Sequence, residues 1–258
     1  MYNMEDNTIK TTCDKKEHQK RMLGFVKKFN VFTESITVNI YDRDFVVLPG
    51  IHKPDRKITS ELYEKSEINC SDIVLEMGCG CGVLSVLFAF KCRNILAIDI
   101  NNTAIMNTEM NCKSLNVNNV TARQSDLFEN VKEGEKFDKV IFNVPFFRIE
   151  PVDVRHMAWC YDRNLFNRFF EGCSFHLNPK GKVYILFTDA GYVEDIINPA
   201  QSHNFVHKVV SVTDVLTRTN EDVVRSAQKY NYNYSDTDLD STNPLIEKYI
   251  VYEFQLRN

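Results

Sequence analysis

Short apolar runs alternate with helical segments through the middle of this 258-residue chain, and this alternation limits the fold more than any other feature. Buried strands that alternate with helices are typical of a parallel sheet covered on both faces. The sequence therefore predicts an α/β fold with a doubly wound sheet. We expect the strands at 72–78, 94–100, 120–126, 139–144, 182–188, 205–214 and 246–256.

An N-terminal extension over residues 1–57 is expected to precede the main domain at 58–258. Within it, 15–29 is expected to be a helix. Alternating apolar and polar residues predict a β-hairpin with strands near 36–41 and 44–48, around an Asp-Arg-Asp turn.

Two more segments complete this organisation. The stretch 58–68 is expected to be helical, with Thr59 or Ser60 as its N-cap. The polar stretch 218–244 is either a long loop or an insertion.

Composition narrows the class of protein. No run of about eighteen apolar residues is present, and the charged N-terminus does not resemble a secretory signal, so we expect no membrane span and a cytoplasmic protein. The eight cysteines form no CxxC pair, which favours reduced thiols and no metal site. Oligomeric state is not readable from the pattern.

Charge bears on nucleic-acid binding. The net charge of −4 disfavours broad binding to nucleic acid, which depends on many phosphate contacts. A basic stretch at 14–29 is one local exception. It is either a solvated helix face or a local RNA-binding patch.

A glycine-rich loop follows the first predicted strand of the main domain and opens a helix. Its glycines, Gly78, Gly80 and Gly82, are each two residues apart, and Glu76 precedes them. Glycine permits a tight turn and a close approach of backbone to a ligand, and a following helix N-terminus adds free amide donors. The dinucleotide fingerprint GxGxxG places its third glycine one residue later than this loop does.

Two carboxylates end the next strands. Asp99 lies 21 residues after Gly78, a distance suited to accepting both ribose hydroxyls of a nucleoside. The alternative is a cap for a helix that begins near Thr103. Asp126 ends the following strand with Leu127 behind it, which suits an adenine amino group and ring; the alternative is a turn aspartate.

The stretch "FDKVIFNVPFF" ends an apolar strand on Asn143 and then presents Pro145 and two phenylalanines. This arrangement is not needed by a core. It suits a site for a flat substrate that carries a nitrogen.

In the order "LEMGCGCG", "AIDINNTA", "QSDLF" and "FNVPFF", these segments resemble the class I S-adenosylmethionine-dependent methyltransferases. The resemblance implies a Rossmann-like, doubly wound, seven-stranded and mostly parallel sheet with an antiparallel last strand. It is strongest to the group with an Asn-Pro-Pro-Tyr/Phe motif, above all the release-factor glutamine N5-methyltransferases. That group also contains adenine N6- and guanine N2-methyltransferases of nucleic acids.

The resemblance also implies site residues. S-adenosylmethionine would be held by Glu76, Gly78, Cys79, Gly80, Gly82, Asp99, Ile100, Asp126, Leu127 and Asn143. The catalytic motif would be Asn143, Val144, Pro145 and Phe146. The acceptor pocket would take Phe147, His156, Trp159 and Tyr161, for which a capped and packed helix is the alternative.

The chemistry explains the motif. An amide or aryl nitrogen is a poor nucleophile because its lone pair is delocalised. The Asn143 oxygen and the Val144 carbonyl would accept its two hydrogens, and Phe146 would stack on its plane. Pro145 restricts Val144 to an extended backbone, which points that carbonyl outward. Val144 stands where the family usually has proline.

Four functions compete. The first is an N-methyltransferase acting on a protein glutamine or a small molecule. The second is an RNA methyltransferase acting on adenine or guanine. The third is a nicotinamide-dependent oxidoreductase, which the glycine spacing disfavours. The fourth is a partner subunit that binds the cofactor without catalysis.

Overall fold

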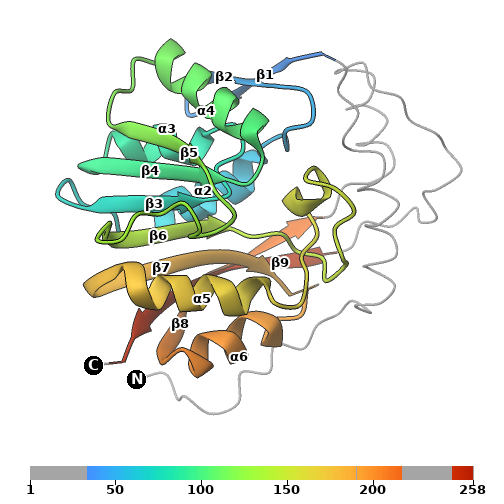
Figure 1. The fold of residues 1–258 in the computed structure, drawn as a ribbon. Coiled ribbons are helices and arrows are strands. Elements are labelled where there is room, and N and C mark those ends of the chain that lie inside the picture. Colours follow the sequence, from blue (N-terminus) through green and yellow to red (C-terminus); the bar gives the residue numbers. More distant parts are fainter. Residues whose placement is uncertain (1–33, 190, 217–245, 258) are drawn as a thin grey trace, which may run out of the picture.

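Seven strands build the central sheet of the computed structural model, which describes residues 34–189, 191–216 and 246–257. They are β3 (Ile73–Met77), β4 (Asn94–Asp99), β5 (Val120–Gln124), β6 (Phe137–Asn143), β7 (Leu177–Thr188), β8 (Phe205–Leu216) and β9 (Ile246–Leu256). Their order across the sheet is β5-β4-β3-β6-β7-β9-β8 (Figure 1).

Strand directions confirm the predicted topology. The neighbours from β5 to β7 pair in parallel, while β9 lies antiparallel to both β7 and β8. The chain runs outward from β3 through β4 to β5, then returns to the other side of β3 as β6. Sequence order therefore reverses between β3 and β6, and ligands of such sheets bind at the carboxyl ends of the strands near this reversal.

Helices cover both faces of the sheet. They are α2 (Arg56–Lys65), α3 (Val83–Ala89), α4 (Asn102–Ser114), α5 (Leu165–His176) and α6 (Glu194–Ser202), with the 3-10 helix η1 (His156–Ala158). In space, α3 contacts both α2 and α4, whereas α5 contacts α6 (Figure 1). The connections from β3 to β5 run toward one edge of the sheet, and the connection from β6 to β7 runs toward the other. Because such crossovers are right-handed, the helices of the first set and α5 lie on opposite faces.

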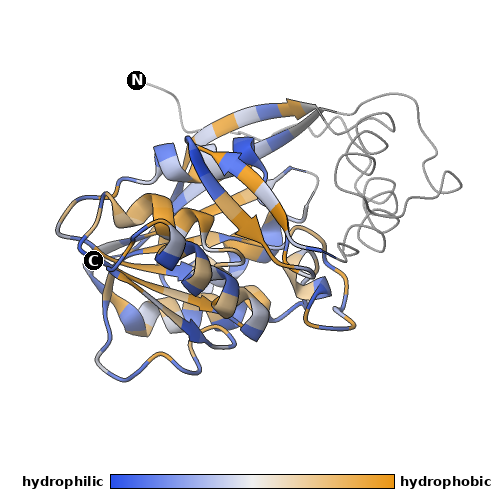
Figure 2. Cartoon of the chain, turned by 90° about the horizontal axis from the view of Figure 1, so that it is seen from above, coloured by the Kyte–Doolittle hydropathy of each residue, from blue (hydrophilic) through white to orange (hydrophobic). Residues whose placement is uncertain are grey.

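The core lies between the sheet and the helices. Figure 2 shows the central strands mainly in the colour of hydrophobic residues. All seven residues of α3 are buried, because that helix contacts neighbouring helices as well as the sheet. Mainly apolar strands such as β3 are expected when both sides of a parallel sheet are covered.

The N-terminal hairpin is confirmed, as β1 (Ile36–Ile40) and β2 (Arg43–Val47). Its turn differs from the predicted Asp-Arg-Asp turn, because Arg43 already pairs with Ile40. The two turn residues are Tyr41 and Asp42, with φ of 51° and 57°. Positive φ at both central positions matches the twist of the flanking strands. Phe45 and Val47 of β2 are fully buried in the same apolar cluster as the sheet.

The predicted N-cap of the next helix is wrong. Asp55, rather than Thr59 or Ser60, caps α2 by accepting the backbone N–H groups of Lys57 and Ile58. An aspartate in extended backbone just before the helix reaches these free donors, whereas Thr59 is buried inside the helix.

Two predictions fall outside the described residues: the N-terminal helix at 15–29 with its basic side chains, and the polar stretch 218–244. Within the described ranges, no helix has the length and hydropathy that crossing a membrane requires. The boundary between 57 and 58 stays a prediction.

Candidate functional site

Four adjacent strands end at one edge of the sheet, and the predicted site residues follow those ends. Met77 pairs with Ile98 of β4 on one side and with Phe142 of β6 on the other. Asp99 ends β4, beside the loop after β3, and Asn143 ends β6. The sheet thus brings together segments that are far apart in sequence, at the position where its strand order reverses.

The glycine loop after β3 needs its glycines for two different reasons. Gly80 has a φ of +56° and open space where a Cβ would lie. Gly82 has a φ of +77°, and a Cβ there would lie 2.8 Å from the Thr108 side chain. Left-handed backbone favours glycine at both positions. Only Gly82 is also needed for close packing on α4.

Asp99 connects this loop to β4. Its Oδ2 accepts the N–H of Gly80 at 3.0 Å, and its Oδ1 accepts the N–H of Asn101 at 2.9 Å. Burial raises the pKa of Asp99, while these backbone donors act in the opposite direction. The side-chain cap of α4 is Asn101, which accepts from Thr103, so helix capping is not the role of Asp99. Its predicted role in ribose binding stays a prediction.

Glu76 lies inside the protein beneath the loop. It is 3% exposed, and the Ser85 hydroxyl on α3 donates to its carboxyl group. Burial, with a smaller contribution from the negative charge of Asp99, raises the pKa of Glu76 to about 8. Burial also raises the pKa of Cys79 well above that of an ordinary thiol. Near pH 7 these groups hold protons, which keeps the carboxyl edge here free of added negative charge.

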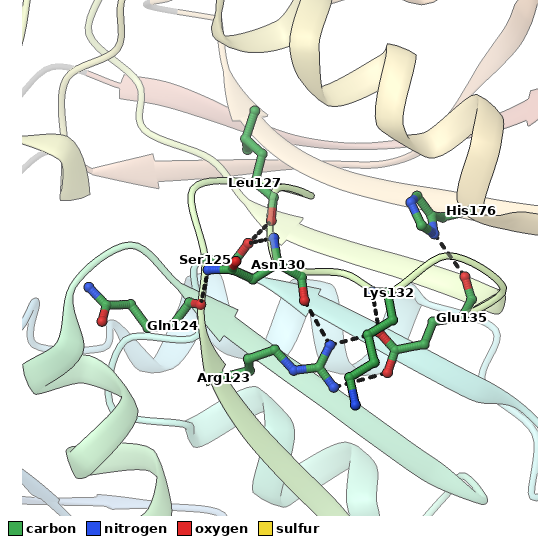
Figure 3. Close-up of polar contacts among 8 residues, drawn as sticks. All are labelled: Arg123, Gln124, Ser125, Leu127, Asn130, Lys132, Glu135 and His176. Carbon is green, nitrogen blue, oxygen red and sulfur yellow. Dashed lines mark hydrogen bonds and ion pairs between the residues drawn. The ribbon is translucent and has the colours of Figure 1, made fainter.

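The loop after β5 is held in a fixed shape by its own polar groups (Figure 3). The Ser125 hydroxyl donates to the Leu127 carbonyl at 2.7 Å and accepts the Asn130 N–H at 2.9 Å. Leu127 adopts a φ of +48°, which is uncommon for a residue with a Cβ. The N–H of Ser125 bonds to the Asp99 carbonyl at 2.9 Å, which ties this loop to the end of β4.

Asp126 has a partner that the local sequence gave no reason to expect. Arg168 on α5 donates through Nη1 to its Oδ2 at 2.9 Å. The same guanidinium lies 3.8 Å from Asp162. The two partners are 42 residues apart, so only the folded chain shows that Asp126 is an ion-paired residue. Its predicted contact with an adenine amino group stays a prediction.

Asn143 carries the most informative atom of the predicted catalytic motif, residues 143–146, which is called the acceptor motif below. Its Oδ1 is buried and has no hydrogen-bond partner among the described residues. Buried polar atoms are nearly always paired, so such an atom at a strand end indicates a position that a ligand donor can complete. Val144 and Pro145 are buried immediately after it.

The two phenylalanines that follow Pro145 are both buried. Phe146 is 9% exposed, with its ring 5.9 Å from that of Phe187 and 5.8 Å from that of Tyr249. Phe147 is 2% exposed. The apolar surface of both rings is buried against neighbouring side chains, because large aromatic area is costly to leave in water.

The four predicted acceptor residues separate into two groups. Tyr161 is buried like Phe147, and its hydroxyl donates to Asp195 at 2.9 Å. His156 and Trp159 are half-buried, and His156 opens η1. The backbone of Phe147 bonds to Trp159 at 2.9 Å, which brings the indole-bearing segment beside the acceptor motif. The sequence did not suggest His52, whose ring meets that of Trp159 edge-to-face at 4.1 Å.

The chain is similar in sequence and in fold to known proteins. The family model described as the methyltransferase small domain matches residues 57–220. A candidate protein N5-glutamine methyltransferase of Methanocaldococcus jannaschii is 32% identical over 168 residues, which make up 58% of this chain and 83% of the relative.

Two more matches extend the comparison. The release factor glutamine methyltransferase of Buchnera aphidicola is 33% identical over 98 residues, which make up 37% of this chain but only 35% of that enzyme. The T. thermophilus 16S rRNA N2 G1207 methyltransferase, solved with AdoMet and guanosine, superposes with a TM-score of 0.55 at 14% identity. The superposition covers 87% of this chain and 50% of that one, and at this identity the likeness is one of fold.

Proposed function

Because the chain belongs to the methyltransferase small-domain family and is an S-adenosylmethionine-dependent methyltransferase, we propose that it methylates a planar nitrogen, foremost the side-chain amide of a protein glutamine. A small-molecule amide or amine is the other form of the same proposal. The observation that carries it is the buried Oδ1 of Asn143 at the end of β6, which has no hydrogen-bond partner in the part of the chain that the structure describes.

The residues at the carboxyl edge of the sheet fit S-adenosylmethionine. Apart from Gly80 and the residues on either side of it, no described residue has an atom within 4 Å of the Cβ position of Gly80, so a ligand can approach the loop backbone closely there. The carboxylate of Asp99, on the neighbouring strand end, suits ribose hydroxyls. Leu127 and the ion-paired Asp126 supply an apolar and an acidic group for an adenine. We assign these residues to the cofactor as part of the proposal.

When bound, S-adenosylmethionine supplies an activated methyl group on a positively charged sulfur. The task that is left to this chain is to orient the nitrogen. The Asn143 oxygen accepts one N–H of the acceptor, and the Val144 carbonyl accepts the other. With both hydrogens held in the amide plane, the lone pair points out of that plane. Such positioning alone is worth several kcal/mol, so no strong base is required.

Phe146 gives the acceptor plane an apolar neighbour. Phe146 is 9% exposed and its ring packs against those of Phe187 and Tyr249, so its orientation is set before any acceptor arrives. Pre-set groups cost no ordering entropy during binding. Half-buried Trp159 and His156 are the residues we assign to recognition of the acceptor beyond the reacting nitrogen.

The relatives favour glutamine as the acceptor. Both the M. jannaschii relative and the B. aphidicola enzyme are named for methylation of glutamine. The eight cysteines of the sequence suit a reducing, cytoplasmic setting, which belongs to the same proposal.

The experiment that tests the proposal is incubation of cell extract with methyl-labelled S-adenosylmethionine and either the wild-type protein or Asn143→Ala. Label is expected in protein, at a glutamine, and only with the wild type. A label confined to RNA would replace glutamine with a nucleobase amine. Equal labelling by the variant would show that Asn143 does not orient the acceptor.

A further inference from the structure

Three neighbouring polar side chains of α4 are completely buried: Asn107, Thr108 and Asn111. Buried amides and hydroxyls are costly unless their hydrogen bonds are made. None of the three was expected from the sequence, where they belong to an ordinary helix. Their partners lie in two other parts of the chain, the glycine loop and the N-terminal hairpin.

Asn111 contacts both of these parts. Its Nδ2 donates to the Cys81 carbonyl in the glycine loop at 2.8 Å and to the Val46 carbonyl of β2 at 2.8 Å. Its Oδ1 accepts the N–H of Val46 at 3.0 Å. The Asn111 side chain therefore fixes the Cys81 carbonyl of the glycine loop. It is itself held by the N–H and the carbonyl of Val46 in the hairpin.

Asn107 makes similar contacts with the hairpin alone. Its Oδ1 accepts the N–H of Leu48 at 2.9 Å, and its Nδ2 donates to the Val46 carbonyl at 2.8 Å. Asn107 and Asn111 have the same chemistry, helix and burial. They differ in the contact to the glycine loop, which makes them a matched pair for experiment.

The carbonyl groups of the glycine loop accept hydrogen bonds from donors inside the protein. The Cys79 carbonyl accepts the Gly82 N–H at 2.8 Å, and the Gly80 carbonyl accepts the Thr108 hydroxyl at 3.3 Å. With Cys81 on Asn111, all three carbonyls between the ends of the loop are directed to internal donors. A peptide group of the loop that lacks such a hydrogen bond can rotate and point its oxygen toward the ligand, which changes the surface that the ligand meets.

We propose that Asn111 is a positioning residue for S-adenosylmethionine. By holding the Cys81 peptide it keeps the glycine loop in the one backbone arrangement that admits the cofactor, and β2 keeps the Asn111 amide in place. The N-terminal hairpin is then part of the support of the cofactor site. Cofactor use follows from the family, so this inference does not depend on the identity of the methyl acceptor.

Isothermal titration calorimetry with S-adenosylmethionine tests this inference on the full chain without any acceptor. Asn111→Asp keeps the side-chain volume and the acceptor for the Val46 N–H, but it replaces the two N–H donors to the Cys81 and Val46 carbonyls by at most one O–H donor, present when the buried carboxyl group is protonated. Asn107→Asp is the control, because it also loses an N–H donor to Val46, and among the described residues the Asn107 side chain has no hydrogen bond to the glycine loop. We expect the dissociation constant to rise about tenfold or more for Asn111→Asp, and less than about threefold for Asn107→Asp.

Equal losses of affinity in the two variants would overturn the inference, because general destabilisation of the hairpin would then explain both. Wild-type affinity in Asn111→Asp would overturn it as well. If an aspartate variant does not fold, the pair Asn111→Leu and Asn107→Leu gives the same comparison without a buried charge. The proposal about the methyl acceptor is tested separately, by the labelling experiment with Asn143→Ala. Neither outcome of that experiment affects the inference about Asn111, which depends on cofactor affinity alone.

Discussion

The carboxylate of Asp99 accepts the backbone N–H of Gly80 at 3.0 Å, so the end of β4 directly holds the loop that follows β3. The second oxygen of the same carboxylate accepts the Asn101 N–H at 2.9 Å, at the entry to α4. One acidic residue thus fixes two backbone segments at the carboxyl edge of the sheet. Any ligand of this edge meets a loop whose shape is already set.

We predict that Asp99→Ala weakens binding of S-adenosylmethionine by about 1–3 kcal/mol, roughly five- to 150-fold. The variant loses the bond to Gly80 and the carboxylate assigned to the ribose. Calorimetric titration measures the change. Asp44→Ala is the control, because the Asp44 side chain is exposed and its carboxylate accepts from Asn39, another residue of the hairpin. Unchanged affinity in Asp99→Ala would contradict both roles.

We predict that alanine destabilises the protein more at Gly82, in the glycine loop, than at Gly134, which lies outside this loop. Gly82→Ala and Gly134→Ala both place a Cβ on left-handed backbone, which costs about 1–2 kcal/mol. Only at Gly82 does that Cβ also lie 2.8 Å from Thr108, whereas open space surrounds Gly134. Urea unfolding should therefore show a larger loss of stability for Gly82→Ala. Equal losses would mean that Thr108 moves aside without cost.

For Asn143→Ala we expect turnover to fall on the order of 100-fold, because a mispositioned acceptor loses most of the benefit of orientation. Cofactor affinity should fall far less. The measurement is single-turnover kinetics on the acceptor identified by labelling, combined with calorimetry. A loss of affinity as large as the loss of turnover would place Asn143 in the cofactor site alone.

The raised pKa of Glu76 predicts how stability depends on pH. With a pKa of about 8 in the folded protein and an ordinary value of 4.5, Glu76 keeps a proton between these values that the unfolded chain releases. Folding then binds protons, so the free energy of unfolding falls as pH rises through this window, by up to roughly 1.4 kcal/mol per pH unit. Below pH 4.5 this loss is absent.

Glu76→Gln removes this titration. Its stability relative to the wild type should therefore increase from pH 5 to pH 8, as measured by urea unfolding at each pH. Glu129→Gln, on the exposed surface, is the control and should follow the wild type. A constant difference between Glu76→Gln and the wild type across this range would show that Glu76 is ionised in the folded protein.

Much of the sheet was predictable because buried parallel strands produce a regular alternation of apolar runs. The seven predicted strands all exist, and β9 is antiparallel as expected. Local capping was less predictable. Asp55 caps α2 although Thr59 and Ser60 have suitable side chains, because a cap depends on the backbone just before the helix.

The site shows the same division. The common location of Gly80, Asp99 and Asn143 at one edge of the sheet was predictable from their order and spacing, since the ends of parallel strands meet there, while their roles in binding stay predictions. Arg168, which pairs with Asp126, gave no local signal, because a contact across 42 residues leaves no period in the sequence. The packing of Phe146 was also missed, since its partners Phe187 and Tyr249 come from other strands.

The sequence by itself determined the fold class, the glycine loop and the residues at the ends of the strands. These features follow from hydrophobic period and from backbone demands within a few residues of each position. Tertiary structure decided which polar groups are buried and paired. It left Asn143 Oδ1 without a partner among the described residues, and it placed Asn111 between the glycine loop and the hairpin. Burial and hydrogen bonding depend on segments that are distant in sequence, so only the packed chain sets them.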